Sequence, residues 1–280
     1  MEIFLPIAFI LVCLKEFSMI RLLSRILWTK IWEIDGMKNL LVLPQLRCSF
    51  ERELPDSQIL VVAGGRKPAS AWLTKVATQF PVWCVDRGID ICYASDVIPE
   101  RLIGDGDSAT SEGWAWGNQL GIPVEVYPPE KNLTDLQLAL QTVGSIHKQA
   151  TVIVTGVWGG RFDHTFSNIY SLKGCENFGV RGCCAADEKE VLILLKGKDS
   201  VRIETTTRPE AVSLLPLSSQ CSGICIDGVH WPLDNVALYD TFPYAVSNRP
   251  DQSGTEITVV IESGWLGIYL CWDEKSLNSE

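Results

Sequence analysis

The chain has 280 residues, which is enough for one large domain or two ordinary ones. Hydrophobic residues make up 46% of it and charged residues 21%, so it can bury a substantial core and does not belong to the disordered class. The formal net charge of −10 argues against nucleic acid as a partner, because non-specific binding needs a basic face that neutralises phosphates.

Residues 1–52 are predicted to form an N-terminal extension that precedes the regular fold. The apolar stretch Ile3–Leu14 has twelve residues, whereas a membrane-spanning helix needs about twenty. Met19–Trp28 mixes apolar and basic residues at helical spacing, as a helix lying on a membrane surface would. A start codon assigned too early, with a more ordinary beginning at Met37, is the alternative that we prefer. Membrane contact is therefore expected only through residues 1–36.

Strand and helix patterns alternate from residue 58 onward. Apolar runs bounded by turn residues predict parallel strands covered on both faces, and these runs are Ile59–Ala63, Val82–Val85, Leu102-Ile103, Val124–Tyr127 and Val152–Thr155. The helices predicted between them are Ala69–Gln79, Ser111–Leu120 and Thr134–Ile146. This alternation predicts an α/β fold with a Rossmann-like, doubly wound parallel-sheet domain over residues 53–188.

The pattern changes after about residue 188. Short strand candidates are separated by Gly, Pro and Asn turns, with no helix predicted between them. They are Val191–Leu195, Ser200–Glu204, Ala211–Leu217, Ile224–Ile226, Ile257–Ile261 and Trp265–Cys271. This texture predicts a small antiparallel β-sandwich domain over residues 189–275.

Acidic residues follow several of the predicted strands, and one more lies at the start of a predicted helix. They are Asp86, Asp105, Asp107, Asp135 and Asp163. Each alone is more typical of a turn or a helix cap. Ligands of open α/β sheets bind beyond the carboxyl ends of the strands, and carboxylates that converge there need a cation to hold them together. Oxygen ligands without His or Cys suit Mg²⁺, which is usually completed by substrate phosphates, so a nucleoside triphosphate is expected.

The stretch Gly156–Arg161 adds a glycine-bearing turn after the last predicted parallel strand. Its backbone amides can approach a phosphate, and Arg161 supplies a fixed cation. Neither GxxxxGK[ST] nor GxGxxG occurs in the sequence. The chain is therefore not an ordinary P-loop kinase or a dinucleotide-binding dehydrogenase.

Six segments occur in a characteristic order. Those of the first half are GDGDS (104–108), KNLTDLQLAL (131–140) and TGVWGGRFDHTFSNI (155–169), and those of the second half are SLLPLS (213–218), DGVHWPLDN (227–235) and AVSNRP (245–250). Together they resemble thiamine pyrophosphokinases, and the last three resemble the β-domain of that family. The resemblance covers roughly residues 58–272. It implies Mg²⁺-dependent transfer of pyrophosphate from the co-substrate ATP to the hydroxyl of thiamine, with release of AMP. It also implies a homodimer whose sites lie near the subunit interface.

The resemblance assigns roles to individual residues. Asp105 and Asp107 would hold Mg²⁺ and the triphosphate, and the catalytic set it implies is Asp105, Asp107, Asp135 and Asp163. The nucleotide-binding set is Asp86, Ser108, Thr134, Gly159, Gly160, Arg161 and His164. On the thiamine side, Trp231 would stack on the cationic ring, and Ser247 and Asn248 would form the other wall.

Three positions depart from the family pattern and leave the substrate open. Gly106 replaces a bulky apolar residue, Asn132 an acidic one and Arg87 a glycine. The alternatives are a related pyrophosphokinase acting on a hydroxymethylpterin, or a catalytically inactive protein that binds thiamine or a nucleotide. Retention of the four catalytic aspartates argues for an enzyme.

The ten cysteines bear on the cellular compartment. They are scattered along a long chain and match no zinc-binding spacing, unlike the cysteines of small secreted scaffolds. We interpret most of them as buried apolar residues in a reducing compartment, and therefore expect a cytoplasmic protein.

Overall fold

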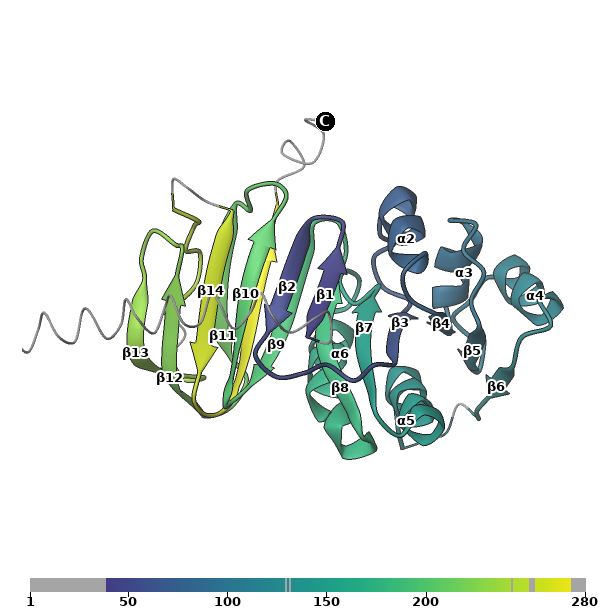
Figure 1. Cartoon of the computed structure of the whole chain (residues 1–280). Coiled ribbons are helices and arrows are strands. Elements are labelled where there is room, and N and C mark those ends of the chain that lie inside the picture. Colours follow the sequence, from purple (N-terminus) through teal and green to yellow (C-terminus); the bar gives the residue numbers. More distant parts are fainter. Residues whose placement is uncertain (1–38, 129, 131, 243, 252–254, 273–280) are drawn as a thin grey trace, which may run out of the picture. The chain divides into compact units, whose positions relative to one another are not determined.

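The computed structural model describes residues 39–128, 130, 132–242, 244–251 and 255–272 (Figure 1). The predictions of a membrane-surface helix or an early start codon in residues 1–36 fall outside the described residues. Within the described residues, no helix is both long enough and apolar enough to cross a membrane.

A nine-stranded sheet carries the predicted parallel strands. Its strand order is β11-β15-β9-β8-β7-β3-β4-β5-β6. The six parallel strands are β3 (Gln58–Val62), β4 (Val82–Val85), β5 (Arg101–Gly104), β6 (Val124–Val126), β7 (Ala150–Thr155) and β8 (Val180–Ala186). β3 lies between β4 and β7, with Val61 opposite both Trp83 and Val154. The strand order reverses at β3, and ligands of such sheets bind beyond the carboxyl ends of the strands at this point, so we call this edge of the sheet the crevice.

Helices cover both faces of the parallel part of this sheet. They are α2 (Ser70–Ala77), α3 (Gly88–Tyr93), α4 (Ser111–Gln119), α5 (Asp135–His147) and α6 (Phe162–Gly174), with a 3₁₀ turn at Cys175–Phe178. On one face, Leu73 and Val76 of α2 and Ile89 of α3 pack against Leu60 and Leu102. The opposite face receives the apolar stripe of α5, in which the buried residues Leu136, Leu140 and Val143 are spaced four and three apart.

A second sheet is antiparallel and has six strands. Its strands, in sheet order, are β1 (Leu40–Leu43), β2 (Leu46–Phe50), β10 (Asp199–Thr205), β14 (Glu256–Ile261), β12 (Gln220–Asp227) and β13 (Leu233–Tyr239). The other antiparallel strands are β9 (Glu190–Lys196), β11 (Ala211–Pro216) and β15 (Trp265–Cys271), which extend the nine-stranded sheet. Phe50, Ile203 and Ile257 of the six-stranded sheet share one apolar cluster with Ile193 and Ile268 of the larger sheet.

The mixed α/β class predicted from the sequence is confirmed, and two features differ from expectation at the predicted domain boundaries. Residues 40–50, placed in the N-terminal extension, form β1 and β2, and Ile203 of β10 pairs with Cys48. The boundary at 188/189 falls in the turn between β8 and β9, which are hydrogen-bonded neighbours in one sheet. The division into separate domains stays a prediction.

Candidate active site

Asp86 lies at the carboxyl-end edge of the parallel strands. It directly follows β4 and has a left-handed φ of +47°, which aspartate tolerates better than most residues. Its Oδ1 accepts hydrogen bonds from the backbone N–H of Asp105 at 3.0 Å and of Gly106 at 3.4 Å. Asp86 thus ties the end of β4 to the loop that follows β5.

The carboxyl group of Asp86 also meets that of Asp135, the first residue of α5. Burial, together with the hydrogen bond to Asp135 and the negative charges of Asp135 and Asp105, raises the pKa of Asp86 to about 7. The negative charge of a neighbouring carboxylate disfavours ionisation of Asp86 and so favours its protonated form. Three of the predicted residues therefore come together here, from β4, β5 and the start of α5.

Gly104, the last residue of β5, provides the space for Asp86. Its φ is +145°, and a Cβ on it would overlap Oδ1 of Asp86. We expect Gly104→Ala to push Asp86 away and to reduce turnover strongly, besides the backbone strain of about 1–3 kcal/mol. Steady-state kinetics and thermal unfolding check this. Gly121→Ala is the matched control, because Gly121 also has a positive φ but nothing lies within 4 Å of its added Cβ. Equal loss of activity in both variants would contradict the role of Gly104.

The loop after β5 contains the other residues of the GDGDS segment. Oδ1 of Asp105 accepts a hydrogen bond from the backbone N–H of Asp107 at 3.2 Å, and Asp107 and Ser108 are exposed. Gly106 departs from the family pattern, and the structure supplies a reason. A Cβ there would come within 2.6 Å of the Trp114 ring on α4, so that indole occupies the space of the missing side chain.

The two candidates at the start of α5 have different surroundings. Thr134 is the N-cap residue and forms a capping box with Gln137. Oγ1 of Thr134 accepts from the N–H of Gln137 at 3.3 Å, and Oε1 of Gln137 accepts from the N–H of Thr134 at 3.0 Å. The capping box gives Thr134 a structural role at the start of α5. Asp135 instead faces Asp86.

The loop after β7 holds the remaining nucleotide-side candidates. Gly159 and Gly160 both have left-handed φ values, +79° and +69°. Nε of Arg161 donates to Oδ1 of Asp163 at 3.1 Å, and this hydrogen bond is the largest cause that lowers the pKa of Asp163. The backbone N–H of His164 also donates to that Oδ1 at 3.0 Å. The structure thus pairs Asp163 with the exposed Arg161 guanidinium.

The donor set of the crevice fits a hard cation that keeps some of its water. Within the described part of the chain, no group of three or more His, Cys, Asp and Glu side chains is arranged to hold a metal ion. The contact between Asp86 and Asp135 nevertheless offers carboxylate oxygens in a place where positive charge would relieve repulsion. One or two carboxylates completed by substrate phosphates is the usual environment of Mg²⁺.

Two of the three predicted thiamine-side residues, Trp231 and Asn248, line a separate cavity of about 250 Å³, whereas Ser247 is not among its lining residues. Its walls are mostly apolar and include Val212, Leu214, Trp231 and Asn248. Trp231 is 56% exposed. Asn248 holds the backbone of Trp231 in both directions: its Oδ1 accepts from the Trp231 N–H at 3.1 Å, and its Nδ2 donates to the Trp231 carbonyl at 2.8 Å. Ser247 has a φ of +58°, and its N–H donates to Ser213 at 2.9 Å.

Two features of these sites were not predicted from the sequence. The guanidinium of Arg249 lies over the Trp231 ring, 5.6 Å from its centroid, where a cationic ligand could also stack. Arg249 directly follows Asn248, but only the fold shows which ring it covers. Gly104 belongs to the GDGDS segment, but its role in making room for Asp86 depends on its φ of +145°, which only the structure gives.

Comparison with known proteins gives a consistent result. A family model described as "Thiamin pyrophosphokinase, catalytic domain" matches residues 75–183, and one described as "Thiamin pyrophosphokinase, vitamin B1 binding domain" matches residues 200–266. The thiamine pyrophosphokinase of Bacillus subtilis (strain 168) is 31% identical over 195 residues, which span 68% of this chain and 88% of that relative.

Solved structures show the same fold. The crystal structure of thiamine pyrophosphokinase from Bacillus subtilis superposes with a TM-score of 0.66 at 24% identity, covering 77% of this chain and 99% of that one. Yeast thiamin pyrophosphokinase gives a TM-score of 0.64 at 14% identity, covering 81% and 90%. From the two matched family domains and the Bacillus relative, we conclude that the chain belongs to the thiamine pyrophosphokinase family.

Proposed function

We propose that the chain transfers pyrophosphate from ATP to the hydroxyl of thiamine at the carboxyl ends of β4, β5 and β7. The observation that carries the location is the contact between the carboxyl groups of Asp86 and Asp135 in that crevice. Membership of the family supports the reaction itself. We include the doubly wound, nucleotide-binding character of residues 53–188 and the thiamine-binding character of residues 189–275 in this proposal.

The cationic and amide groups of the site would bind phosphate, and its carboxylates would bind the metal ion. Pyrophosphoryl transfer depends mainly on positioning and charge neutralisation. The amides of the loop Gly156–Arg161 would bind phosphate oxygens, and Arg161 would leave Asp163 to neutralise them. Asp86, Asp105, Asp107 and Asp135 would hold Mg²⁺, which would neutralise the triphosphate. Ser108, Thr134 and His164 would line the nucleotide side.

On the thiamine side, the Trp231 ring would stack on the cationic ring, and Asn248 would keep the indole in place by its two backbone hydrogen bonds. Arg249 must then leave the face that the ligand uses. Ser247 would complete the wall next to Asn248.

The distance between the two sites supports a second copy of the chain as partner. The cavity wall includes β11, which is six strand-to-strand steps from β4 in the sheet. At about 4.8 Å a step, the two are about 30 Å apart along the sheet, whereas reacting atoms must approach to about 3–3.5 Å. We therefore propose a homodimer in which the crevice of one copy faces the cavity of the other.

Exposed aromatic side chains beside both sites favour the same arrangement. On α6, immediately after Arg161, the residues Phe162, Phe166 and Tyr170 are spaced by four and are 79%, 51% and 43% exposed. Near the cavity, Phe242 and Tyr244 are 68% and 46% exposed. Exposed apolar patches of this kind mark protein–protein contacts.

The direct test is AMP formation from ATP and Mg²⁺ with thiamine, with hydroxymethylpterin, and with neither. We expect AMP and thiamine diphosphate in equal amounts with thiamine only, and loss of both when EDTA removes the metal. AMP released only with the pterin would show that the substrate is the pterin and not thiamine. No AMP with either compound, from folded protein, would favour the binding protein.

The cysteines support the proposed cytoplasmic location. All nine cysteines among the described residues are free thiols, and seven of them are buried. Free thiols persist in a reducing compartment. Fractionation of cells that express the full chain would test the location.

A further inference from the structure

Arg66 links the loop after β3 to the loop after β7. Its backbone N–H donates to the carbonyl of Trp158, and the neighbouring N–H of Gly65 donates to the carbonyl of Gly156 at 2.8 Å. A Cβ added to Gly159 would lie 3.0 Å from Cβ of Arg66. The loop Gly156–Arg161 therefore rests directly on Arg66.

The side chain of Arg66 is anchored to the turn between β8 and β9. Its Nε and Nη2 reach Oδ2 of Asp187 at 3.0 and 2.5 Å, and its Nη1 reaches Oε1 of Glu190 at 2.8 Å. Asp187 is fully buried, and its other oxygen accepts from the N–H groups of Lys189 and Glu190, both at 2.9 Å. A buried carboxylate with this many partners fixes the guanidinium in one geometry.

A closed ring of contacts returns from this anchor to the loop. Glu190, which holds Arg66, also accepts a hydrogen bond from the hydroxyl of Tyr269 on β15 at 2.9 Å. The Tyr269 ring packs edge-on against Trp158, with the centroids 6.4 Å apart. Trp158, only 7% exposed, is therefore held at its carbonyl by Arg66 and at its ring by Tyr269.

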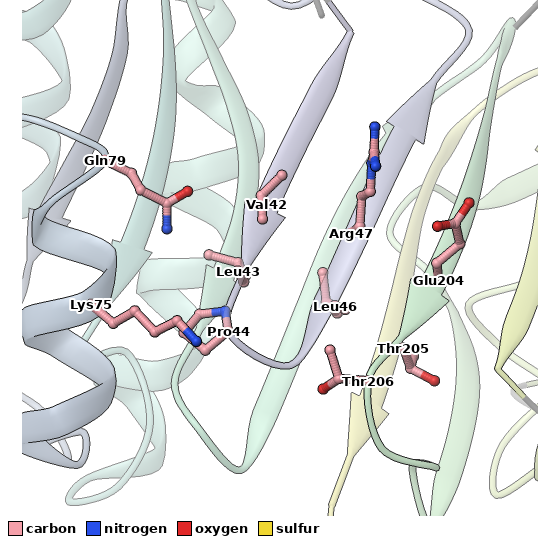
Figure 2. Close-up of a pocket in the computed structure, with 10 residues that line it drawn as sticks. All are labelled: Val42, Leu43, Pro44, Leu46, Arg47, Lys75, Gln79, Glu204, Thr205 and Thr206. Carbon is pink, nitrogen blue, oxygen red and sulfur yellow. The ribbon is translucent and has the colours of Figure 1, made fainter. Parts of the chain in front are cut away.

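The N-terminal hairpin supports the same anchor. Gln45, in the turn between β1 and β2, donates to the carbonyl of Asp187 at 2.6 Å and accepts from Nε1 of Trp72 on α2 at 2.8 Å. Figure 2 shows Lys75 of α2 beside Leu43 and Pro44 of the hairpin, where all three line a cavity of about 380 Å³. Gln45 is 5% exposed, so these hydrogen bonds are shielded from water.

We propose that Arg66 is a positioning residue for ATP binding: held by Asp187 and Glu190, it fixes the loop Gly156–Arg161 in the shape that receives phosphate. No motif of the sequence points to this role, because Gly64-Gly65-Arg66-Lys67 is too short for a Walker loop. The inference rests on the proposed function, in which that loop binds the nucleotide.

The test is the double variant R66M/D187N in the full chain. Removing both charges avoids leaving Asp187 buried and unpaired, and the asparagine that replaces Asp187 would retain the oxygen that accepts from the turn. The dissociation constant of ATP with Mg²⁺, measured by calorimetry without thiamine, should rise about tenfold, because the loop is less ordered. The KM for ATP should rise with it, while the KM for thiamine should stay unchanged.

The chain offers a matched control in R181M/D199N. Nη2 of Arg181 reaches Oδ2 of Asp199 at 2.9 Å, and the Asp199 side chain is 1% exposed, but this pair joins the starts of β8 and β10. We expect a similar fall in melting temperature with unchanged ATP binding. Equal ATP affinity in R66M/D187N and the unaltered protein, or an equal loss of affinity in both double variants, would overturn the positioning role. If R66M/D187N binds ATP more weakly but the unaltered protein forms no thiamine diphosphate, only the proposed reaction is contradicted.

Discussion

Asp86→Asn is expected to reduce turnover by about 10²–10³-fold and, at the same time, to stabilise the ligand-free protein at pH 8. Asparagine keeps the oxygen that accepts from the N–H groups of Asp105 and Gly106 but removes the charge that opposes Asp135. If Asp86 serves to bind a cation, as proposed, its charge repels that of Asp135 in the ligand-free protein and destabilises the folded state. Steady-state kinetics and thermal unfolding without ligands measure the two effects.

The pH dependence follows from the direction of the pKa shift. In the folded chain, burial and Asp135 raise the pKa of Asp86 from 3.8 to about 7. The folded state then binds a proton more tightly than the unfolded state, so stability falls as pH rises from about 4 to about 7. Discounted for partial exposure to solvent, the difference at pH 8 is roughly 1–2 kcal/mol, or a few degrees in melting temperature. At pH 5 Asp86 is protonated in most molecules of the unaltered folded protein, and the advantage of the variant should largely disappear.

Asp96→Asn is the matched control, because Asp96 also has a left-handed φ, +52°, but is exposed. It should change neither the turnover nor the pH dependence of the melting temperature. A less stable Asp86→Asn variant at pH 8, or one with full activity, would contradict the role of Asp86.

Mixing two impaired variants should restore activity if each site is built from two copies of the chain. Asp86→Asn damages the nucleotide half, and Trp231→Ala the thiamine half, where loss of stacking should lower kcat/KM for thiamine about tenfold. In a mixed dimer, one site carries both substitutions and the other carries neither. After random exchange of subunits in equal amounts, about a quarter of all sites should be intact.

The measurement is AMP formation at a thiamine concentration far below KM, after the two variants are co-expressed with different tags. Asp86→Asn mixed with Asp105→Asn is the control, because both substitutions lie in the nucleotide half and no mixed dimer contains an intact site. Activity in the first mixture no higher than the average of its two parents would rule out the shared site. Recovery in both mixtures would point to an unrelated effect of mixing.

The parallel strands could be predicted from the sequence because their residues are apolar on both faces. The predicted strand Ile59–Ala63 corresponds to β3 at Gln58–Val62, and Val82–Val85 coincides with β4. Since parallel strands end at one edge, the positions of Asp86 and Asp105 followed from the same pattern. This reasoning needed no knowledge of the side-chain contacts.

Other elements lack a local signal. The aromatic residues of α6 that are spaced by four, Phe162, Phe166 and Tyr170, are exposed, and only Ser171 and Leu172 are buried, so this helix has no buried apolar stripe like that of α5. β8 contains Gly182 and small residues, and its place beside β7 depends on the whole sheet. The turn between β1 and β2 is Pro44-Gln45, which is not one of the turn pairs typical of hairpins.

The contacts between individual side chains also could not be predicted from the sequence. Five aspartates looked equivalent, yet Asp86 meets Asp135 whereas Asp163 pairs with Arg161. That difference depends on where α5 and α6 begin relative to the strand ends. The sequence predicts that Asn248 contacts thiamine. The structure shows that its side chain also forms two hydrogen bonds to the backbone of Trp231.

The unbroken nine-stranded sheet constrains how substrates enter and leave. Hydrogen bonds connect β7 to β8, β9, β15 and β11 without a gap, so the crevice and the cavity wall of one copy belong to a single stiff body. A hinge between the two halves of the chain, as in many two-domain kinases, would have to break this ladder. Opening and closing must therefore come from loops and side chains, such as Arg249 over Trp231, or, in the proposed dimer, from one subunit rocking against the other.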